Sequence, residues 1–217
     1  MTRAALHARL EHGLAALGLA LPGQAVERLL DYQALLERWN GTYNLTAVRD
    51  PEGMVTRHLL DSLAILPYVR GATLADLGTG PGLPGIPLAI AAPGREVVLV
   101  DSNGKKVRFL REAIRALQLE GVRAVQSRVE EVEGRFDCIT ARAFASLGDM
   151  LGWGGHLLAP EGIWLAMKGK PADEELPGIP PGFELRARHA LEVPGLDAER
   201  HLLVLGHVPA SGAVTAA

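Results

Sequence analysis

The segment Leu74-Ala75-Asp76-Leu77-Gly78-Thr79-Gly80-Pro81-Gly82-Leu83-Pro84-Gly85 carries the strongest structural signal in this 217-residue sequence. It leaves an apolar strand and enters a helix, and its glycines permit a sharp turn with a ligand lying against bare backbone. We therefore expect backbone N–H groups and the start of the following helix to face a negatively charged ligand group.

Short apolar runs alternate with helical patterns on either side of this segment. The clearest helix is predicted over Gly104–Leu119, and the strands are predicted over Thr73–Leu77, Glu96–Val100, Val122–Gln126, Phe136–Ala141 and Gly162–Met167. Such alternation predicts an α/β fold whose sheet is mostly parallel. Two further extended runs, Phe183–Val193 and Arg200–Val208, have no helix between them, so we expect an antiparallel pair at the C-terminal sheet edge.

Residues 1–70 show helical signals instead. Helices are predicted near residues 3–19 and over a second apolar stripe that Asn40-Gly41 would end, and Asp50-Pro51 has the pattern of an N-cap followed by proline. We interpret residues 1–70 as a helical extension on a core of residues 71–208. Residues 209–217 are predicted to be a disordered tail.

The composition limits the partners and the compartment. Twenty-two Lys and Arg against 25 Asp and Glu give a net charge of −3, which excludes a polycation that coats nucleic acid but leaves local basic patches possible. The single cysteine, Cys138, excludes a disulfide scaffold and a thiolate metal cluster. The apolar run Gly13–Pro22 continues a leucine stripe of an amphipathic helix, so we interpret it as a surface helix rather than a signal peptide. We expect no membrane span, no bound metal and a cytoplasmic location.

Two nucleotide-type ligands fit the glycine segment. Gly80-x-Gly82-x-x-Gly85 matches the dinucleotide fingerprint, whereas Asp76-x-Gly78-x-Gly80-x-Gly82 matches the S-adenosylmethionine loop of Rossmann-like class I methyltransferases. The carboxylate of Asp76 would suit the α-ammonium group of S-adenosylmethionine and would repel a pyrophosphate. Asp101, 19 residues beyond Gly82, can accept both ribose hydroxyls in either class of enzyme.

Several other segments together resemble the RsmG (GidB) family, bacterial methyltransferases that act on guanine N7 in small-subunit 16S ribosomal RNA. The resemblance covers residues 25–208. It is carried by Trp39-Asn40, Tyr43-Asn44-Leu45-Thr46, His58-Leu59-Leu60-Asp61-Ser62-Leu63, Asp76 through Pro87, Asp101-Ser102, Lys105-Lys106, Phe109-Leu110, Gln126 through Glu131, Arg142-Ala143-Phe144-Ala145, Lys168-Gly169 and Glu199-Arg200-His201.

The resemblance implies S-adenosylmethionine as the cofactor and a set of residues that contact it. Gly78 would approach through its backbone, Leu83 would pack against the ligand, and Val129 and Glu130 would flank the adenine. With Gly80 and Asp101, which the glycine segment and the strand-end acid indicate on their own, the predicted cofactor contacts are Gly78, Gly80, Leu83, Asp101, Val129, Glu130 and Arg142. The implied partner is 16S ribosomal RNA or the small ribosomal subunit, and we expect a monomer.

The acceptor atom is indicated by what the sequence lacks. Methylation of a pyrimidine carbon needs a cysteine nucleophile, and Cys138 lies inside a predicted apolar strand. The Asp/Asn-Pro-Pro-aromatic segment of exocyclic amine methyltransferases is replaced by Ala141-Arg142-Ala143-Phe144. Guanine N7 needs neither device, because it has a free lone pair and no proton to lose. We therefore expect catalysis by positioning, with no catalytic base.

The RNA contacts are expected to come from basic side chains at the ligand end of the sheet. Lys168 and Arg200 are the candidates at strand ends. The basic run Lys105–Arg115 fits RNA binding and a solvated helix face equally well. His58 and Asp61 could close over the cofactor or the guanine, or could serve helix capping and core packing.

Two other functions remain open from the residues alone. An NAD-dependent oxidoreductase is favoured only by the Gly80–Gly85 match, and it predicts a Tyr-x-x-x-Lys pair or a catalytic histidine that is not visible. A non-enzymatic RNA-binding factor on a degenerate scaffold is disfavoured by the intact glycine segment and Asp101.

Overall fold

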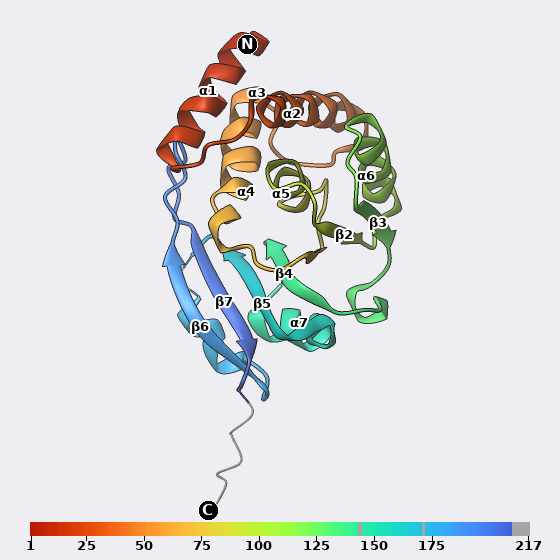
Figure 1. Ribbon diagram of the computed structural model, residues 1–217, viewed down its shortest axis with the longest axis vertical. Coiled ribbons are helices and arrows are strands. Elements are labelled where there is room, and N and C mark those ends of the chain that lie inside the picture. Colours follow the sequence, from red (N-terminus) through yellow and green to blue (C-terminus); the bar gives the residue numbers. More distant parts are fainter. Residues whose placement is uncertain (143–144, 171, 210–217) are drawn as a thin grey trace, which may run out of the picture.

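A seven-stranded sheet forms the centre of the computed structural model, which describes residues 1–142, 145–170 and 172–209 (Figure 1). The strand order is β3-β2-β1-β4-β5-β7-β6. The first five strands in this order are parallel, and β7 and β6 are added antiparallel at one edge. The chain reverses its direction of travel across the sheet between β1 and β4, and ligands of open α/β sheets bind beside such a reversal.

The strands form close to where the sequence predicts them. Their bounds are β1 (Thr73–Leu77), β2 (Glu96–Asp101), β3 (Val122–Gln126), β4 (Phe136–Arg142), β5 (Leu158–Lys168), β6 (Phe183–Ala190) and β7 (His201–His207). The mostly parallel α/β sheet and its antiparallel C-terminal edge pair are thereby confirmed. The main differences are that β5 begins four residues earlier than predicted and that β6 ends three residues earlier.

The helices also follow the predicted order. They are α1 (Arg3–Ala16), α2 (Gly23–Tyr43), α3 (Pro51–Met54), α4 (Asp61–Leu63), α5 (Gly85–Ala91), α6 (Gly104–Ala116) and α7 (Leu147–Gly154). The side chain of Asp50 caps α3 by accepting from the Gly53 N–H at 2.5 Å, as predicted. The predicted stop at Asn40-Gly41 is wrong, because α2 continues to Tyr43 and ends on Asn44 in the left-handed conformation.

A π-helical segment, η1 (Val55–Leu60), joins α3 to α4. Segments of this kind widen the helix by one residue in a turn and are frequent at functional sites. This one carries Arg57 and His58, and Asp61 follows directly. No pattern in the sequence indicates the widened turn.

The two faces of the sheet are buried by different helices. One apolar core joins side chains from α1 and α2, such as Leu10 and Leu29, to Leu74, Leu99 and Leu165 of the sheet. The other core packs α7, through Leu147 and Leu151, against alternate residues of the same strands. The N-terminal helices and the central strands therefore share one apolar core.

Two sequence expectations concern the ends of the chain. The amphipathic first helix is confirmed, since Leu6, Leu10 and Leu14 are buried along one side of α1. The predicted tail from residue 210 onward lies outside the described residues. No helix among the described residues is long and apolar enough to cross a bilayer.

Candidate functional site

The glycine segment forms a tight turn between β1 and α5 at the carboxyl end of the parallel strands. Gly78, Gly80 and Gly82 have φ values of +64°, +61° and +102°, which glycine adopts without strain. A Cβ atom at Gly82 would also collide with Ile86. The segment is therefore built around backbone conformations that favour glycine and, at Gly82, a close contact that excludes a side chain.

Asp76 stabilises this turn from the protein interior through hydrogen bonds to its side chain. Its side chain is fully buried, and its Oδ2 atom accepts from the Thr79 hydroxyl and, at 2.8 Å, from the Gly85 N–H. Its Oδ1 atom accepts from the Thr140 hydroxyl at 3.0 Å. Burial raises the pKa of Asp76 to about 6, against the opposing effect of these hydrogen bonds.

Two interpretations of this segment are corrected by that arrangement. Asp76 does not reach out to an ammonium group, because its carboxylate is fully buried and lines neither of the two cavities described below. The first N–H of α5, from Gly85, donates to Asp76 and so is not available to an anionic ligand. The acid at the strand end thus stabilises the conformation of the glycine segment.

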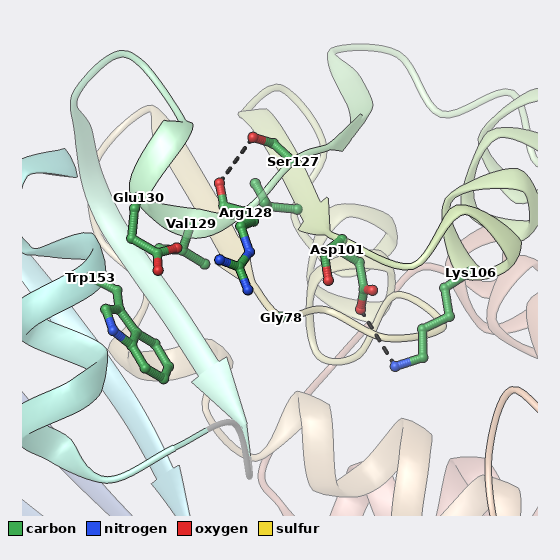
Figure 2. A pocket seen from close by; sticks show the side chains of 10 residues that line it. Gly78, Asp101, Lys106, Ser127, Arg128, Val129, Glu130 and Trp153 are labelled. Atoms are coloured by element: carbon green, nitrogen blue, oxygen red, sulfur yellow. Dashed lines mark hydrogen bonds and ion pairs between the residues drawn. The ribbon is translucent and has the colours of Figure 1, made fainter.

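A cavity of about 390 Å³ opens beside the turn (Figure 2). Four of the predicted cofactor-binding residues line it, together with side chains from α6, α7 and the loop after β3. The lining residues are Gly78, Val100, Asp101, Ser102, Lys106, Ser127, Arg128, Val129, Glu130 and Trp153. The volume lies within the range of small-molecule sites.

Asp101 supplies the buried acid of this first cavity. Its Oδ2 atom accepts from the Gly80 N–H at 2.9 Å, and its Oδ1 atom accepts from the Asn103 N–H at 2.8 Å. Lys106 Nζ lies 3.6 Å from Oδ2. Each carboxylate oxygen retains a second lone pair, so the group can still accept hydroxyl donors from the cavity.

The opposite wall of the first cavity is the short 3₁₀ segment η3 (Val129–Glu131). Val129 is buried and belongs to the core beneath the wall, whereas Glu130 is exposed. Trp153 of α7 completes the wall (Figure 2). Trp153 was not predicted from the sequence, because the packing of α7 beside η3 is what brings it to this wall.

Three predicted cofactor residues, Gly80, Leu83 and Arg142, do not line the first cavity. Gly80 lies in the turn and contacts the site through its hydrogen bond to Asp101. Leu83 is 3% exposed and packs in the core shared with α2 and α5. Their contact with a cofactor stays a prediction.

A second cavity, of about 340 Å³, lies between the helical extension and the ends of β4 and β5. Three predicted functional residues, Arg142, Lys168 and Arg200, meet there. The lining residues are Val48, Arg57, His58, Asp61, Arg142, Met167, Lys168, Gly169 and Arg200. Arg142 was predicted with the cofactor, and the structure places it in this cavity and not among the lining residues of the first one.

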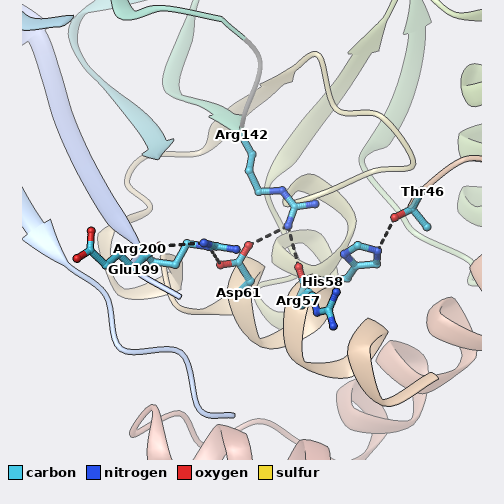
Figure 3. Close-up of polar contacts among 7 residues, drawn as sticks. All are labelled: Thr46, Arg57, His58, Asp61, Arg142, Glu199 and Arg200. Atoms are coloured by element: carbon cyan, nitrogen blue, oxygen red, sulfur yellow. Dashed lines mark hydrogen bonds and ion pairs between the residues drawn. The ribbon is translucent and has the colours of Figure 1, made fainter. Parts of the chain in front are cut away.

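Asp61 lies between two of these arginines (Figure 3). Its Oδ2 atom accepts from Arg142 Nη1 at 3.0 Å, and its Oδ1 atom accepts from Arg200 Nε at 2.8 Å. The Asp61 side chain is 2% exposed, while those of Arg142 and Arg200 are 21% and 23% exposed. The carboxylate is therefore covered by its two partners, which themselves reach the cavity.

His58 is held beside this cluster. Its Nε2 atom lies 2.9 Å from the Thr46 hydroxyl, and Figure 3 shows its ring between Thr46 and Arg142. Burial, followed by the positive charge of Arg142, lowers the pKa of His58 to about 4. The imidazole is thus neutral at physiological pH.

Lys168 is less free than its position at a strand end suggested. Its Nζ atom donates to the Ala145 carbonyl and to Glu175 Oε2, both at 2.7 Å. Its side chain is 10% exposed. Lys168 consequently ties the loop after β4 to η5 (Asp173–Gly178) as well as lining the second cavity.

Cys138 lies inside a strand and the basic run lies on a helix, both as the sequence predicts. Cys138 is fully buried in β4, and burial raises the pKa of its thiol to about 12, so no thiolate is available. On α6, Lys105, Arg108 and Arg111 are exposed to solvent. Within the part of the chain that the structure describes, no group of three His, Cys, Asp or Glu side chains could hold a metal ion.

The strand order and the ligand-sized cavity at the chain reversal define a class I methyltransferase fold. Solved structures share this fold at low identity. The TrmN enzyme from Thermus thermophilus is 22% identical with a TM-score of 0.57, covering 71% of this chain and 53% of that one. Magnesium protoporphyrin IX methyltransferase (ChlM) from Synechocystis PCC 6803, solved with bound SAM, is 13% identical with a TM-score of 0.59, covering 81% and 97%.

Sequence comparison is more specific. The model of the GidB family, rRNA small subunit methyltransferase G, matches residues 25–203. A protein of Stenotrophomonas maltophilia (strain K279a) called ribosomal RNA small subunit methyltransferase G is 56% identical over 204 residues, covering 93% of this chain and 95% of that protein. The protein of the same name from Xanthomonas oryzae pv. oryzae (strain MAFF 311018) is 56% identical over 200 residues, covering 91% and 93%. The chain belongs to the rRNA small subunit methyltransferase G family.

This membership confirms the resemblance found in the sequence. It also removes the oxidoreductase alternative, since the family is one of methyltransferases. The embedded Gly80–Gly85 match to a dinucleotide fingerprint is therefore coincidental, as short glycine motifs often are.

Proposed function

We propose that this protein transfers the methyl group of S-adenosylmethionine to N7 of a guanine in 16S ribosomal RNA, acting as a monomer in the cytoplasm. The observation that carries the proposal is the pair of cavities at the carboxyl ends of the parallel strands. The first contains the buried acid Asp101, and the second is lined by Arg142, Lys168 and Arg200. A nucleoside cofactor suits the first cavity, and a polyanionic substrate suits the second.

The chain's own residues would hold the cofactor in the first cavity. Asp101 would accept hydrogen bonds from the ribose hydroxyls, and Val129 with Glu130 would flank the adenine. Gly78 would let the ligand approach the backbone, while Gly80 would keep Asp101 oriented through its 2.9 Å hydrogen bond. Bound S-adenosylmethionine would supply an electrophilic methyl group on a sulfonium.

We assign guanine N7 as the acceptor because its methylation needs the base to be positioned and needs neither a nucleophile nor a general base. Cys138, the only cysteine, is buried as a neutral thiol. His58 is neutral at physiological pH. A base is nonetheless not required, because N7 carries a lone pair and has no proton to remove. Alignment of N7, the methyl carbon and the sulfonium would supply the rate enhancement.

The helical extension of residues 1–70 would form the outer wall of the acceptor site on the core of residues 71–208. Val48, Arg57, His58 and Asp61 of the second cavity all come from this extension. Arg200 and Lys168, from the core, would contact the RNA across from them. The acceptor base would thus enter between the two parts.

The proposal is tested by following a labelled methyl group. Small-subunit RNA from cells that lack this protein, offered as naked RNA and as assembled subunits, is incubated with the enzyme and methyl-labelled S-adenosylmethionine. We expect label in 16S ribosomal RNA and none in large-subunit RNA treated in parallel. Label confined to protein or to large-subunit RNA would contradict the proposal.

The cofactor assignment has its own control. S-Adenosylmethionine should raise the melting temperature of the protein by mass action, whereas NAD at the same concentration should leave it unchanged. A variant with Asp101 replaced by alanine should lose most of the S-adenosylmethionine shift. An equal shift with NAD would contradict the assignment of the first cavity.

A further inference from the structure

The cluster around Asp61 differs from an ordinary surface ion pair, because its carboxylate is buried and binds two arginines. One buried carboxylate uses both oxygens, one for Arg142 at 3.0 Å and one for Arg200 at 2.8 Å. The three residues come from α4, the end of β4 and the residue before β7, so three separate parts of the chain meet at one point. Figure 3 shows the two guanidinium groups approaching the carboxylate from different sides.

Each arginine is fixed by a second contact. Arg142 Nη1 also donates to the Arg57 carbonyl at 3.1 Å, and Arg200 Nη1 donates to the Glu199 carbonyl at 2.8 Å. A guanidinium carries five N–H donors, and among the described residues neither Nη2 group has a hydrogen-bond partner, so both can donate to a ligand. Both side chains line the second cavity.

The charge of the cluster suits a phosphodiester. Arg142 and Arg200 carry two positive charges and Asp61 one negative charge, so the cluster has a net charge of +1. The carboxylate is 2% exposed and lies behind its partners, so an approaching anion meets guanidinium and not carboxylate. Planar guanidinium groups pair with phosphate oxygens through two parallel hydrogen bonds.

We propose that Asp61 is a positioning residue that holds Arg142 and Arg200 as a two-armed fork for one backbone phosphate of the RNA next to the acceptor base. This inference rests on the proposed function and gives the Arg142 side chain an RNA contact in addition to the cofactor contact predicted for this residue. Fixing the two arms in advance reduces the side-chain entropy that is lost when the phosphate binds.

The charge of Asp61 and its positioning role predict opposite effects on RNA binding. Replacing Asp61 with asparagine removes a negative charge from the site, so charge alone predicts tighter RNA binding. If Asp61 instead orients the fork, Asp61→Asn weakens RNA binding, because the amide places an NH2 donor against one of the two guanidinium groups where the carboxylate had an acceptor. The two explanations therefore predict changes of opposite sign.

Glu199 provides the matched control. It precedes Arg200, its side chain is 69% exposed, and Glu199→Gln removes the same unit of charge while keeping the backbone carbonyl that Arg200 contacts. Binding of 16S ribosomal RNA to wild type and both variants is measured by filter retention at several salt concentrations. Calorimetry with S-adenosylmethionine on the same preparations reports on the cofactor site.

We expect Asp61→Asn to weaken RNA binding about tenfold, the loss of roughly one charged hydrogen-bonded contact. The slope of log affinity against log salt should fall by about one, as for one lost phosphate contact. Glu199→Gln should bind RNA at least as tightly as wild type. S-Adenosylmethionine affinity should stay within about threefold in both, less than the change expected for one lost hydrogen bond to a charged group.

Three results would overturn the fork. They are RNA binding by Asp61→Asn as tight as that of Glu199→Gln, weaker binding with an unchanged salt slope, and an equal loss of cofactor affinity. If Asp61→Asn does not fold, Arg200→Ala, which leaves Asp61 paired with Arg142, must lower the slope by about one, and an unchanged slope rejects the fork. Methyl transfer by the wild type is scored separately, so a failure of the proposed function is recognised by itself.

Discussion

The carboxylate of Asp76, at the end of β1, accepts a 2.8 Å hydrogen bond from the backbone N–H of Gly85, at the start of α5. This contact closes the glycine segment from the inside. Thr79 and Thr140 donate to the same carboxylate, so a single buried acid joins β1, the turn, α5 and β4. The shape of the first cavity therefore depends on a residue that does not line it.

Replacement of Asp76 by asparagine should destabilise the protein. An amide presents one acceptor oxygen where three donors converge, so its NH2 group faces at least one donor that the carboxylate accepted. We expect the free energy of unfolding at pH 8 to fall by about 1–3 kcal/mol in urea titrations. Asp31→Asn, which removes a carboxylate from an exposed ion pair with Arg3, should change it by less than about 1 kcal/mol. A smaller effect at Asp76 than at Asp31 would contradict the structural role.

Replacement of Asp101 by alanine should weaken cofactor binding. The carboxylate is the acid expected at the ribose, and the loss of charged hydrogen bonds costs about 1–3 kcal/mol. Titration calorimetry with S-adenosylmethionine measures the change directly. Glu120→Ala, at an exposed acid before β3, serves as the control and should leave the affinity unchanged. Wild-type affinity in the Asp101 variant would remove this residue from the ribose site.

Cys138 should be dispensable for methyl transfer. The thiol is buried in β4 and its pKa is raised to about 12 by that burial, so it cannot act as a nucleophile at neutral pH. We expect Cys138→Ala to retain the wild-type rate and to lose about 1 kcal/mol of stability through the small cavity it leaves. A folded variant that binds cofactor but transfers no methyl group would reopen a covalent mechanism.

His58 should make the stability depend on pH below about 6.5. Its folded pKa, about 4, lies below its usual value of 6.5, so between these values the unfolded chain binds a proton that the folded protein does not. Acidification through this window therefore destabilises the fold, by about 3 kcal/mol at most. Asp76 acts in the opposite direction, because its folded pKa of about 6 lies above its usual value of 3.8.

Comparison with His58→Gln separates the two groups. Asp76 is present in both proteins, so its contribution cancels in the difference between their unfolding free energies. We expect wild type to lose stability relative to His58→Gln as the pH falls from 6.5 to 4, with the two curves parallel above pH 7. Curves that stay parallel throughout would show that His58 is not buried as a neutral imidazole.

The fold could be predicted from sequence because its signals are local. Apolar runs such as Val97 to Val100 mark strands buried on both faces, and the stripe of α6 marks its buried side. The Asp50-Pro51 cap likewise needs only neighbouring residues. These patterns located the five parallel strands and the edge pair, although the beginning of β5 and the end of α2 were misplaced.

The site was predicted less completely because its contacts cross long sequence separations. Asp61 meets Arg200 across 139 positions, and no periodic pattern reports such a pairing. Trp153 reaches the first cavity only because α7 packs beside η3. Asp76 was correctly predicted to be important but was assigned the wrong partner, since a motif does not distinguish an acid that faces the ligand from one that faces the turn.

The chemical position of the new methyl group tests the central claim most directly. Methylation at N7 places a fixed positive charge on the purine, which makes the ring sensitive to borohydride and the strand sensitive to aniline. Small-subunit RNA from cells lacking this protein, treated with the enzyme and S-adenosylmethionine, should gain one aniline-sensitive guanine. Incorporation of methyl groups into that RNA without any new cleavage site would contradict methylation at guanine N7.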